Sequence, residues 1–184
     1  MIYSVIIIYF LLLLISLVAM VFMVLLLWAA FFTKVPFIPV DKKILPAIVG
    51  AMQLGEGSVV YDLGCGDGRV LEACSLLNPE AQYIGLDKDW MPIILAKWRT
   101  WRNKNIKILR RDFFQHDFSD ATHIYMYLLP EMMDALLPEL EKELRSGTRL
   151  VACDYTFAKK EPMKIIDLNR ANKKRGKRLL VYNF

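Results

Sequence analysis

The sequence predicts an α/β domain, with a mostly parallel seven-stranded sheet covered by helices on both faces, preceded by one transmembrane helix. Three observations support this fold class. Residues 2–32 contain no Asp, Glu, Lys or Arg. Residues 59–77 read as a β-prone run, a glycine turn and an apolar segment with helical spacing. From there, strand and helix patterns alternate along the chain, which ends in two strand-like runs, 164–168 and 179–184.

The charge-free N-terminal run is long enough for one tilted membrane span, because about twenty apolar residues cross the hydrocarbon core of a bilayer. A cleavable signal peptide has a basic start, a shorter apolar region and a small-residue cleavage site. Here the start is uncharged apart from the α-amine, and the apolar run continues to residue 32. We therefore predict that residues 1–33 form a transmembrane anchor.

Charge predicts the orientation of this anchor. Lys34, Lys42 and Lys43 follow the apolar run, and the whole chain has a formal net charge of +5. The positive-inside rule then places the C-terminal domain in the cytoplasm, with the lipid bilayer as a partner. The start also lacks an Arg-rich transit-like pattern. We therefore expect a single-pass protein of a prokaryotic plasma membrane in preference to the mitochondrial inner membrane.

Proline ends the membrane helix. Pro36 and Pro39 cannot continue a helix, and they bias the preceding residues toward extended backbone. Asp41 then fits the N-cap of an amphipathic helix through Ile48 and Met52. We assign residues 34–57 to a linker with this helix and residues 58–184 to one domain, because the roughly 150 residues after the anchor suffice for a single core.

The stretch 59–70 reads Val-Val-Tyr-Asp-Leu-Gly-Cys-Gly-Asp-Gly-Arg-Val. Its alternate glycines are Gly64, Gly66 and Gly68. Glycine reaches backbone angles closed to other residues and lets a ligand lie against the main chain, while the next helix offers free N–H groups. A dinucleotide-binding fingerprint needs its third glycine where this chain has Arg69. Asp62, just before the turn, would repel a pyrophosphate and suits a cationic ligand.

This order of residues resembles motif I of the class I S-adenosylmethionine (SAM) methyltransferases, an acidic residue followed by Gly-x-Gly-x-Gly. SAM carries an α-amino group and a sulfonium, which explains an acid at the turn. The resemblance implies a Rossmann-like sheet whose seventh strand lies antiparallel beside the fifth. It also implies that SAM is the cofactor and that the motif holds its amino-acid end. The motif residues are Asp62, Gly64, Gly66, Asp67 and Gly68.

Two further acids fit the same family. Asp87 ends a predicted strand at 82–86, about twenty residues after the glycine turn, where a carboxylate accepts hydrogen bonds from ribose hydroxyls. Asp112 and Phe113 follow a predicted strand at 106–109. In the family's pattern an acidic residue at this place contacts the adenine amino group, and an adjacent apolar residue covers the ring.

A second resemblance lies before motif I. Pro36-Phe37-Ile38-Pro39 looks like the pre-methyltransferase motif of the small membrane-anchored lysine methyltransferases that modify the ATP synthase c-subunit and the adenine nucleotide translocase. The resemblance implies that Pro36 and Phe37 belong to the cofactor site and that a lysine of a membrane protein is the acceptor. Those proteins usually continue with Thr or Ser, whereas this chain has Val40, which lacks the hydroxyl.

The predicted strand 122–129 bears on the acceptor. Enzymes that methylate amino groups of bases often carry Asp/Asn-Pro-Pro-Tyr/Phe at its end, and this chain reads Tyr-Met-Tyr-Leu-Leu-Pro, so nucleic acid is disfavoured. Tyr127 is a candidate to orient an ammonium group, with simple packing as the alternative. No residue is assigned as a general base. Cysteine spacing predicts no metal site, and we expect Cys65, Cys74 and Cys153 to be buried thiols.

Two basic segments remain. The predicted helix 90–102 interleaves tryptophan with Lys and Arg, and we expect the tryptophans to pack on the sheet or touch the membrane interface, in preference to nucleic-acid stacking. The loop before residue 179 is strongly basic. Attraction to anionic lipid head groups explains it more simply than RNA binding, and a solvated hairpin is the alternative.

Together these features predict a membrane-anchored, SAM-dependent protein-lysine N-methyltransferase that acts on a membrane protein. A methyltransferase for a lipid or isoprenoid small molecule is one alternative. A non-catalytic SAM-binding protein is the other.

Overall fold

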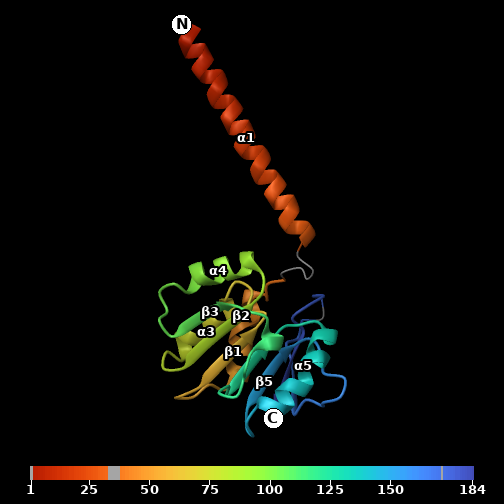
Figure 1. Cartoon of the computed structure of the whole chain (residues 1–184). Helices are drawn as coiled ribbons and strands as arrows, with labels where there is room; N and C mark the ends of the chain where they lie inside the picture. Colours follow the sequence, from red (N-terminus) through yellow and green to blue (C-terminus); the bar gives the residue numbers. More distant parts are fainter. Residues whose placement is uncertain (1, 33–37, 171) are drawn as a thin grey trace. The chain divides into compact units, whose positions relative to one another are not determined.

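The computed structural model describes residues 2–32, 38–170 and 172–184 (Figure 1). The chain divides into two compact units, Met1–Pro36 and Phe37–Phe184. The first unit contains the helix α1, Ile2–Phe32. Over Ile2–Leu27 this helix is long and apolar enough to cross a membrane, a requirement that N-terminal signal sequences also meet.

The second unit alternates strands and helices along most of its length (Figure 1). Its helices are η1 (Lys42–Ile44), α2 (Leu45–Met52), α3 (Arg69–Leu77), α4 (Trp90–Thr100), η2 (Phe113–Gln115) and α5 (Pro130–Glu143). Its strands are β1 (Val59–Leu63), β2 (Gln82–Asp87), β3 (Ile106–Arg110), β4 (His123–Met126), β5 (Arg149–Cys153), β6 (Lys164–Asp167) and β7 (Arg178–Asn183).

The seven strands form one sheet in the order β3-β2-β1-β4-β5-β7-β6. The pairs from β3 to β5 are parallel, and β7 lies antiparallel between β5 and β6. The predicted fold class and the antiparallel insertion of the seventh strand beside the fifth are therefore confirmed. The neighbours of β1 are β2 on one side and β4 on the other, so the strand order reverses at β1. The loops that follow these strands meet beyond the carboxyl end of β1.

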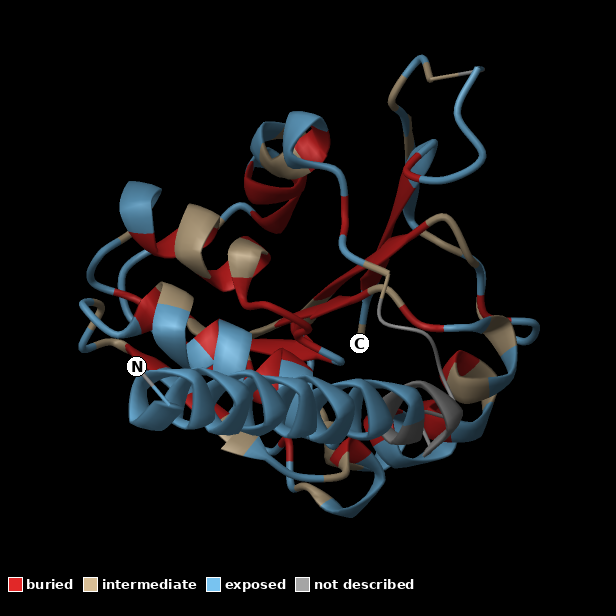
Figure 2. Cartoon of the chain, turned by 90° about the horizontal axis from the view of Figure 1, so that it is seen from above, coloured by how far each residue is buried: buried red, intermediate tan, exposed pale blue. Residues whose placement is uncertain are grey.

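Each face of the sheet has its own hydrophobic core, because successive side chains of a strand point to opposite faces. Val60 of β1 belongs to the core under α2, α3 and α4, whereas the adjacent Tyr61 belongs to the core under α5. Figure 2 shows the buried residues gathered along the strands and the inner sides of these helices. The helices thus cover both faces and leave the carboxyl edge of the parallel strands free for a site.

Local sequence explains several boundaries. The Asp41 carboxylate accepts a hydrogen bond from the Lys43 N–H at 3.0 Å and so caps η1. The strand β4 ends at Met126, three residues before the predicted end. Pro130 occupies the first turn of α5, and a proline biases the residue before it toward extended backbone, so Leu129 has left the sheet and caps α5.

All three cysteines are free and buried, as predicted. Burial raises the pKa of the Cys74 and Cys153 thiols to about 12, with nearby acidic groups adding to the effect. They therefore remain protonated at neutral pH and behave as small apolar core residues.

Candidate active site

The glycine turn follows β1 and leads directly into α3. Gly64, Gly66 and Gly68 have φ values of 73°, 56° and 73°, in the left-handed region that favours glycine. The Gly64 and Cys65 N–H groups donate to the Leu86 carbonyl at 2.8 and 2.9 Å, which fixes the turn against β2. A Cβ atom at Gly68 would lie 3.2 Å from the Ala96 Cβ of α4, so the turn is also closely packed at this position. A residue other than glycine at position 68 is therefore disfavoured both by its φ value and by this contact.

Asp87 lies at the end of β2, across from this turn. Its carboxylate accepts hydrogen bonds from the Gly66 N–H at 3.1 Å and from the Asp89 N–H at 3.0 Å. An ionised carboxylate has about four acceptor positions, so further hydroxyl donors can still bind. Burial raises the pKa of Asp87 despite these two hydrogen bonds.

Asp62 is the most buried acid of the turn, with 2% of its surface exposed. Burial raises the pKa of its carboxyl well above the ordinary value, and the charges of Asp87 and Asp67 raise it further. Among the described residues no basic side chain forms an ion pair with it. A cationic ligand group placed beside Asp62 would favour the ionised carboxylate and lower its pKa again.

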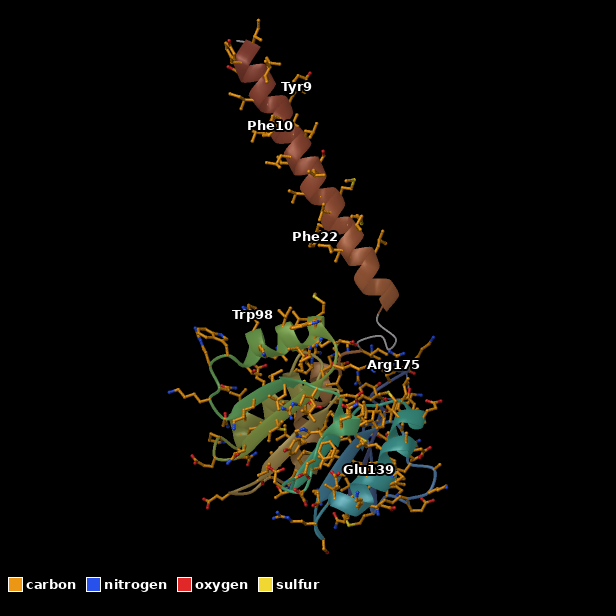
Figure 3. All side chains as sticks on the ribbon, viewed as in Figure 1. Tyr9, Phe10, Phe22, Trp98, Glu139 and Arg175 are labelled. Atoms are coloured by element: carbon orange, nitrogen blue, oxygen red, sulfur yellow. The ribbon has the colours of Figure 1, made fainter. Side chains whose placement is uncertain are left out.

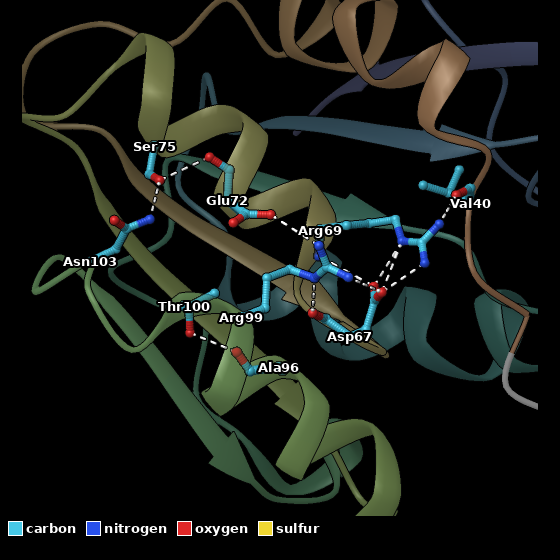
Figure 4. A network of polar contacts seen from close by, with 9 residues as sticks. All are labelled: Val40, Asp67, Arg69, Glu72, Ser75, Ala96, Arg99, Thr100 and Asn103. Carbon is cyan, nitrogen blue, oxygen red and sulfur yellow. Dashed lines mark hydrogen bonds and ion pairs between the residues drawn. The ribbon is translucent and has the colours of Figure 1, made fainter.

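Asp67 has a different environment, shown in Figure 4. Its carboxylate pairs with Arg69 at 2.7 Å and with Arg99 of α4 at 2.8 Å. Burial alone would raise the pKa of Asp67, but the hydrogen bond and charge of Arg69 and the charge of Arg99 outweigh it and lower the pKa. Arg69 also donates to the Val40 carbonyl at 2.6 Å. Asp67 thus ties the turn to α4 and, through Arg69, to the segment before η1.

Asp112 and Phe113 follow β3 and begin η2. The Asp112 carboxylate accepts the Phe114 N–H at 3.1 Å and so caps this short helix. The Phe113 ring is 6% exposed, belongs to the core under α5 and lies 4.8 Å from the Phe114 ring between centroids. Phe114 is the more exposed of the two aromatic rings at this position.

Tyr127 comes directly after β4 and is half-buried. Its hydroxyl donates to the Asp154 carboxylate at 3.1 Å, and its ring stacks on Tyr155 with centroids 6.3 Å apart. Burial, followed by the charge of Asp154, raises the pKa of Tyr127 well above its ordinary range. The phenol is therefore a protonated, oriented group at neutral pH.

Asp154 follows β5 in a left-handed conformation, with φ of 66°. Besides Tyr127, its carboxylate accepts the backbone N–H groups of Gly176 at 2.6 Å and Lys177 at 2.7 Å. These two residues precede β7, so one carboxylate joins the end of β4 to the loop between β6 and β7. Sequence reasoning did not find Asp154, whose partners all lie more than twenty residues away along the chain, Tyr127 before it and Gly176 and Lys177 after it.

A cleft of about 380 Å³ opens beside Tyr127. Its other lining residues are Ile38, Pro39, Val40, Asp41, Arg170, Lys173, Lys174, Arg175 and Gly176. An ion pair between Asp41 and Arg170 joins the segment before η1 to the basic loop. Pro36 and Phe37, also predicted for the cofactor site, lie outside the described residues.

The sheet brings these groups to one edge. Asp62 is in register with Gly85 of β2 and Tyr125 of β4. Asp87 and Tyr127 each lie one residue beyond the last pair of these two ladders. A ligand crevice is expected at this switch point of an open α/β sheet. The left-handed glycines, the buried acid and the available Asp87 oxygens fit SAM, with its ammonium, sulfonium and ribose.

Comparison with solved structures agrees with this site. An RNA methyltransferase from Salinibacter ruber in complex with S-adenosyl-L-homocysteine matches with a TM-score of 0.72 and 26% identity, over 79% of this chain and 93% of that one. The fold and the site together define a SAM-dependent methyltransferase.

The sequence profile of the ANTKMT methyltransferase domain matches residues 62–164, more than half of the chain. The chain belongs to this family. A protein-lysine N-methyltransferase of Saccharolobus islandicus is 30% identical over 141 residues, which cover 75% of this chain and 88% of that protein. The human lysine N-methyltransferase of the ATP synthase c-subunit is 29% identical over 66% of this chain. This chain spans 52% of the human protein's length.

Proposed function

We propose that this SAM-dependent methyltransferase is a protein-lysine N-methyltransferase whose acceptor is a lysine of a membrane protein. The observation that carries the proposal is the position of Tyr127. Its oriented phenol follows β4, the strand next to the one that leads into the glycine turn, at the edge where the methyl group would be transferred. The activities of the Saccharolobus islandicus and human relatives support a lysine acceptor.

For the cofactor, we assign roles to the residues of the carboxyl edge. The three glycines and Asp62 hold the amino-acid end of SAM, and Asp87 binds the ribose hydroxyls. Asp112 and Phe113 serve the adenine, Pro36 and Phe37 close the site, and Asp67 keeps the turn in shape. SAM supplies a methyl group on an already activated sulfonium, so the chain's own contribution is proximity and in-line orientation of the acceptor.

For the acceptor, Tyr127 can accept a hydrogen bond from an ammonium group through its phenol oxygen and offers it the face of its ring. A lysine must lose its proton before it attacks. A desolvated site lowers the pKa of a lysine, which favours the neutral amine. We assign no general base: the ammonium proton passes to water, and the neutral amine then attacks the methyl group of SAM.

For the location, we propose that α1 anchors the chain as a single-pass protein, with the methyltransferase domain in the cytoplasm of a prokaryotic cell. Lys34, Lys42 and Lys43 on the domain side of α1 support this orientation. SAM is made in the cytosol, and an acceptor held in the same bilayer meets the site at a high effective concentration.

The test uses the full chain in detergent, methyl-labelled SAM and membranes of its own host. Protein, lipid and RNA are separated after the reaction, with Asp87→Ala as the control. We expect base-stable label in a protein band that is absent with the control. Label in the lipid fraction would instead establish the lipid alternative, and bound SAM without any transfer would establish a binding protein.

A further inference from the structure

The helix α4 has two apolar faces, of which the sheet covers one. Its inner residues Pro92, Ile93, Ala96 and Thr100 are buried. Its outer face, continued by the C-cap residue, consists of exposed apolar side chains: Trp90, Met91, Ile94, Leu95, Trp98 and Trp101. We call these six residues the α4 outer face. At about 100° per residue they share one side of the helix, spread over roughly 140°.

The α4 outer face is highly exposed to solvent for a surface made of large apolar side chains. Trp98 is 77% exposed, Trp101 70% and Trp90 63%. Figure 3 shows Trp98 on the outer side of α4, directed away from the sheet. A contiguous exposed apolar surface of this kind normally marks an interaction site, so a partner is expected to cover this face.

The charges around the α4 outer face are positive. Lys97, Arg102 and Arg110 are exposed, and residues 90–102 contain no Asp or Glu. The Arg110 guanidinium lies 4.1 Å from the Trp90 ring centroid, and that of Arg102 lies 4.8 Å from the Trp101 ring. Both cations are thus held beside the tryptophans at the rim of the apolar face.

We propose that the α4 outer face binds the surface of an anionic lipid bilayer. Tryptophan with Lys or Arg at the rim is the composition of helices that lie in the interface, with aromatic rings at head-group depth and cations on the phosphates. A second copy of this chain is a poorer partner, because a self-contact would bring like charges of Lys97, Arg102 and Arg110 together.

The short connection between α1 and the domain also favours a lipid bilayer as the partner. Only residues 33–37 separate α1 from the first described residue of the domain, Ile38. That connection spans about 20 Å at most when fully extended. A domain tethered so closely to a membrane-spanning α1 meets the bilayer at high local concentration. The inference concerns how the domain binds lipid, and it stands whichever acceptor the enzyme methylates.

The test places a fluorophore on each side of the domain of the full chain. Ile94→Cys on the α4 outer face is labelled with the polarity-sensitive dye NBD, and Ala135→Cys on the exposed side of α5 is the matched control. The native cysteines are buried and leave the introduced thiol as the reactive one. Each protein is reconstituted in nanodiscs of phosphatidylcholine with phosphatidylglycerol, with and without nitroxide-labelled acyl chains.

We expect nitroxide lipid to quench the dye at position 94 at least about threefold more strongly than at position 135. Replacing both Lys97 and Arg102 by Glu should reduce this quenching. Equal quenching at the two positions overturns the proposal. A dye at position 94 that is shielded from water but not quenched by lipid also overturns it, and identifies a protein contact instead. If Ile94→Cys fails to fold, the exposed Met91→Cys replaces it.

Discussion

The proposed cofactor side and the proposed acceptor side of the site are built differently. The cofactor side, Asp62 to Gly68 with Asp87, is shaped by the main chain: positive φ values and N–H groups that donate to Leu86 and Asp87. The acceptor side, Tyr127 with the loop between β6 and β7, depends on the Asp154 side chain. The proposed cofactor side therefore rests on local backbone geometry, whereas the proposed acceptor side rests on contacts between residues far apart in the sequence.

The two sides also differ in their electrostatics. Burial raises the pKa values of Asp62 and Asp87, so the cofactor side holds acidic groups in surroundings that disfavour their charge. On the acceptor side the Asp154 carboxylate is satisfied by Tyr127 and two backbone N–H groups. The buried acids of the proposed cofactor side lower the stability of the fold and favour the binding of a cation. The hydrogen bonds of Asp154 on the proposed acceptor side stabilise the fold.

The largest effect is expected on the cofactor side. Asp87→Ala removes the predicted ribose contact and the partner of the Gly66 N–H, and we expect SAM affinity to fall about 100-fold, as for the loss of charged hydrogen bonds. Titration calorimetry measures this affinity. Asp89→Ala is the matched control, because Asp89 contacts Asp87 through its main-chain N–H only. Equal SAM affinity in both variants would show that Asp87 does not bind the cofactor.

The next effect concerns the acceptor side. Asp154→Ala leaves the Gly176 and Lys177 N–H groups without their acceptor and places alanine at a positive φ. We expect the free energy of unfolding to fall by about 2 kcal/mol. Asp154→Asn keeps an acceptor oxygen and tolerates the left-handed conformation, so it should recover most of this loss. Thermal unfolding in detergent compares the two, and equal stability of the Ala and Asn variants would contradict this role of Asp154.

A smaller effect is expected at Tyr127, and it distinguishes orientation of the acceptor from binding of SAM. Tyr127→Phe removes the hydroxyl that contacts Asp154, and we expect kcat to fall about tenfold with SAM affinity unchanged, since one oriented hydrogen bond is lost. Tyr155→Phe, on the ring stacked against Tyr127, is the control. If both variants kept the original kcat, Tyr127 would have only a packing role.

The smallest effect is a change in pH dependence. Because the pKa of Asp62 is raised on folding, the folded state binds more protons, and stability falls as pH rises from about 3.8 through the raised value. Asp62→Asn removes this contribution. We expect the variant without SAM to be more stable at neutral pH by on the order of 1 kcal/mol and to bind SAM more weakly.

Thermal unfolding between about pH 5 and about pH 8 tests this sign. The original chain should lose more stability over that interval than Asp62→Asn does. A steeper loss in the variant would show that the Asp62 carboxyl is not held protonated by burial.

The contrast between the two sides explains what the sequence could predict. The turn of Gly64, Gly66 and Gly68 and the acid Asp87 lie within one strand–helix–strand unit, whose spacing is visible in the chain. The insertion of β7 beside β5 was also predictable, through the family resemblance. Asp154 was missed because its partners precede β7, and their proximity exists only after the sheet has assembled.

Two further features needed the three-dimensional structure. Both faces of α4 are apolar, so periodicity could not decide whether Trp98 packs on the sheet; the structure shows that Ile93 and Ala96 take the inner side. In the sequence, Arg69 stands out only because it breaks a dinucleotide fingerprint. Its bonds to Asp67 and to the Val40 carbonyl show that it connects the glycine turn to the segment before η1.

The most direct test of lysine methylation in a membrane protein is tandem mass spectrometry of the protein band that acquires label from SAM in host membranes. We predict methyl groups on the ε-amine of a lysine in a membrane protein, with loss of the modification for Asp87→Ala and its reduction for Tyr127→Phe. Methylation of another side chain, or of lysines at the same level with Asp87→Ala, would contradict the proposed function.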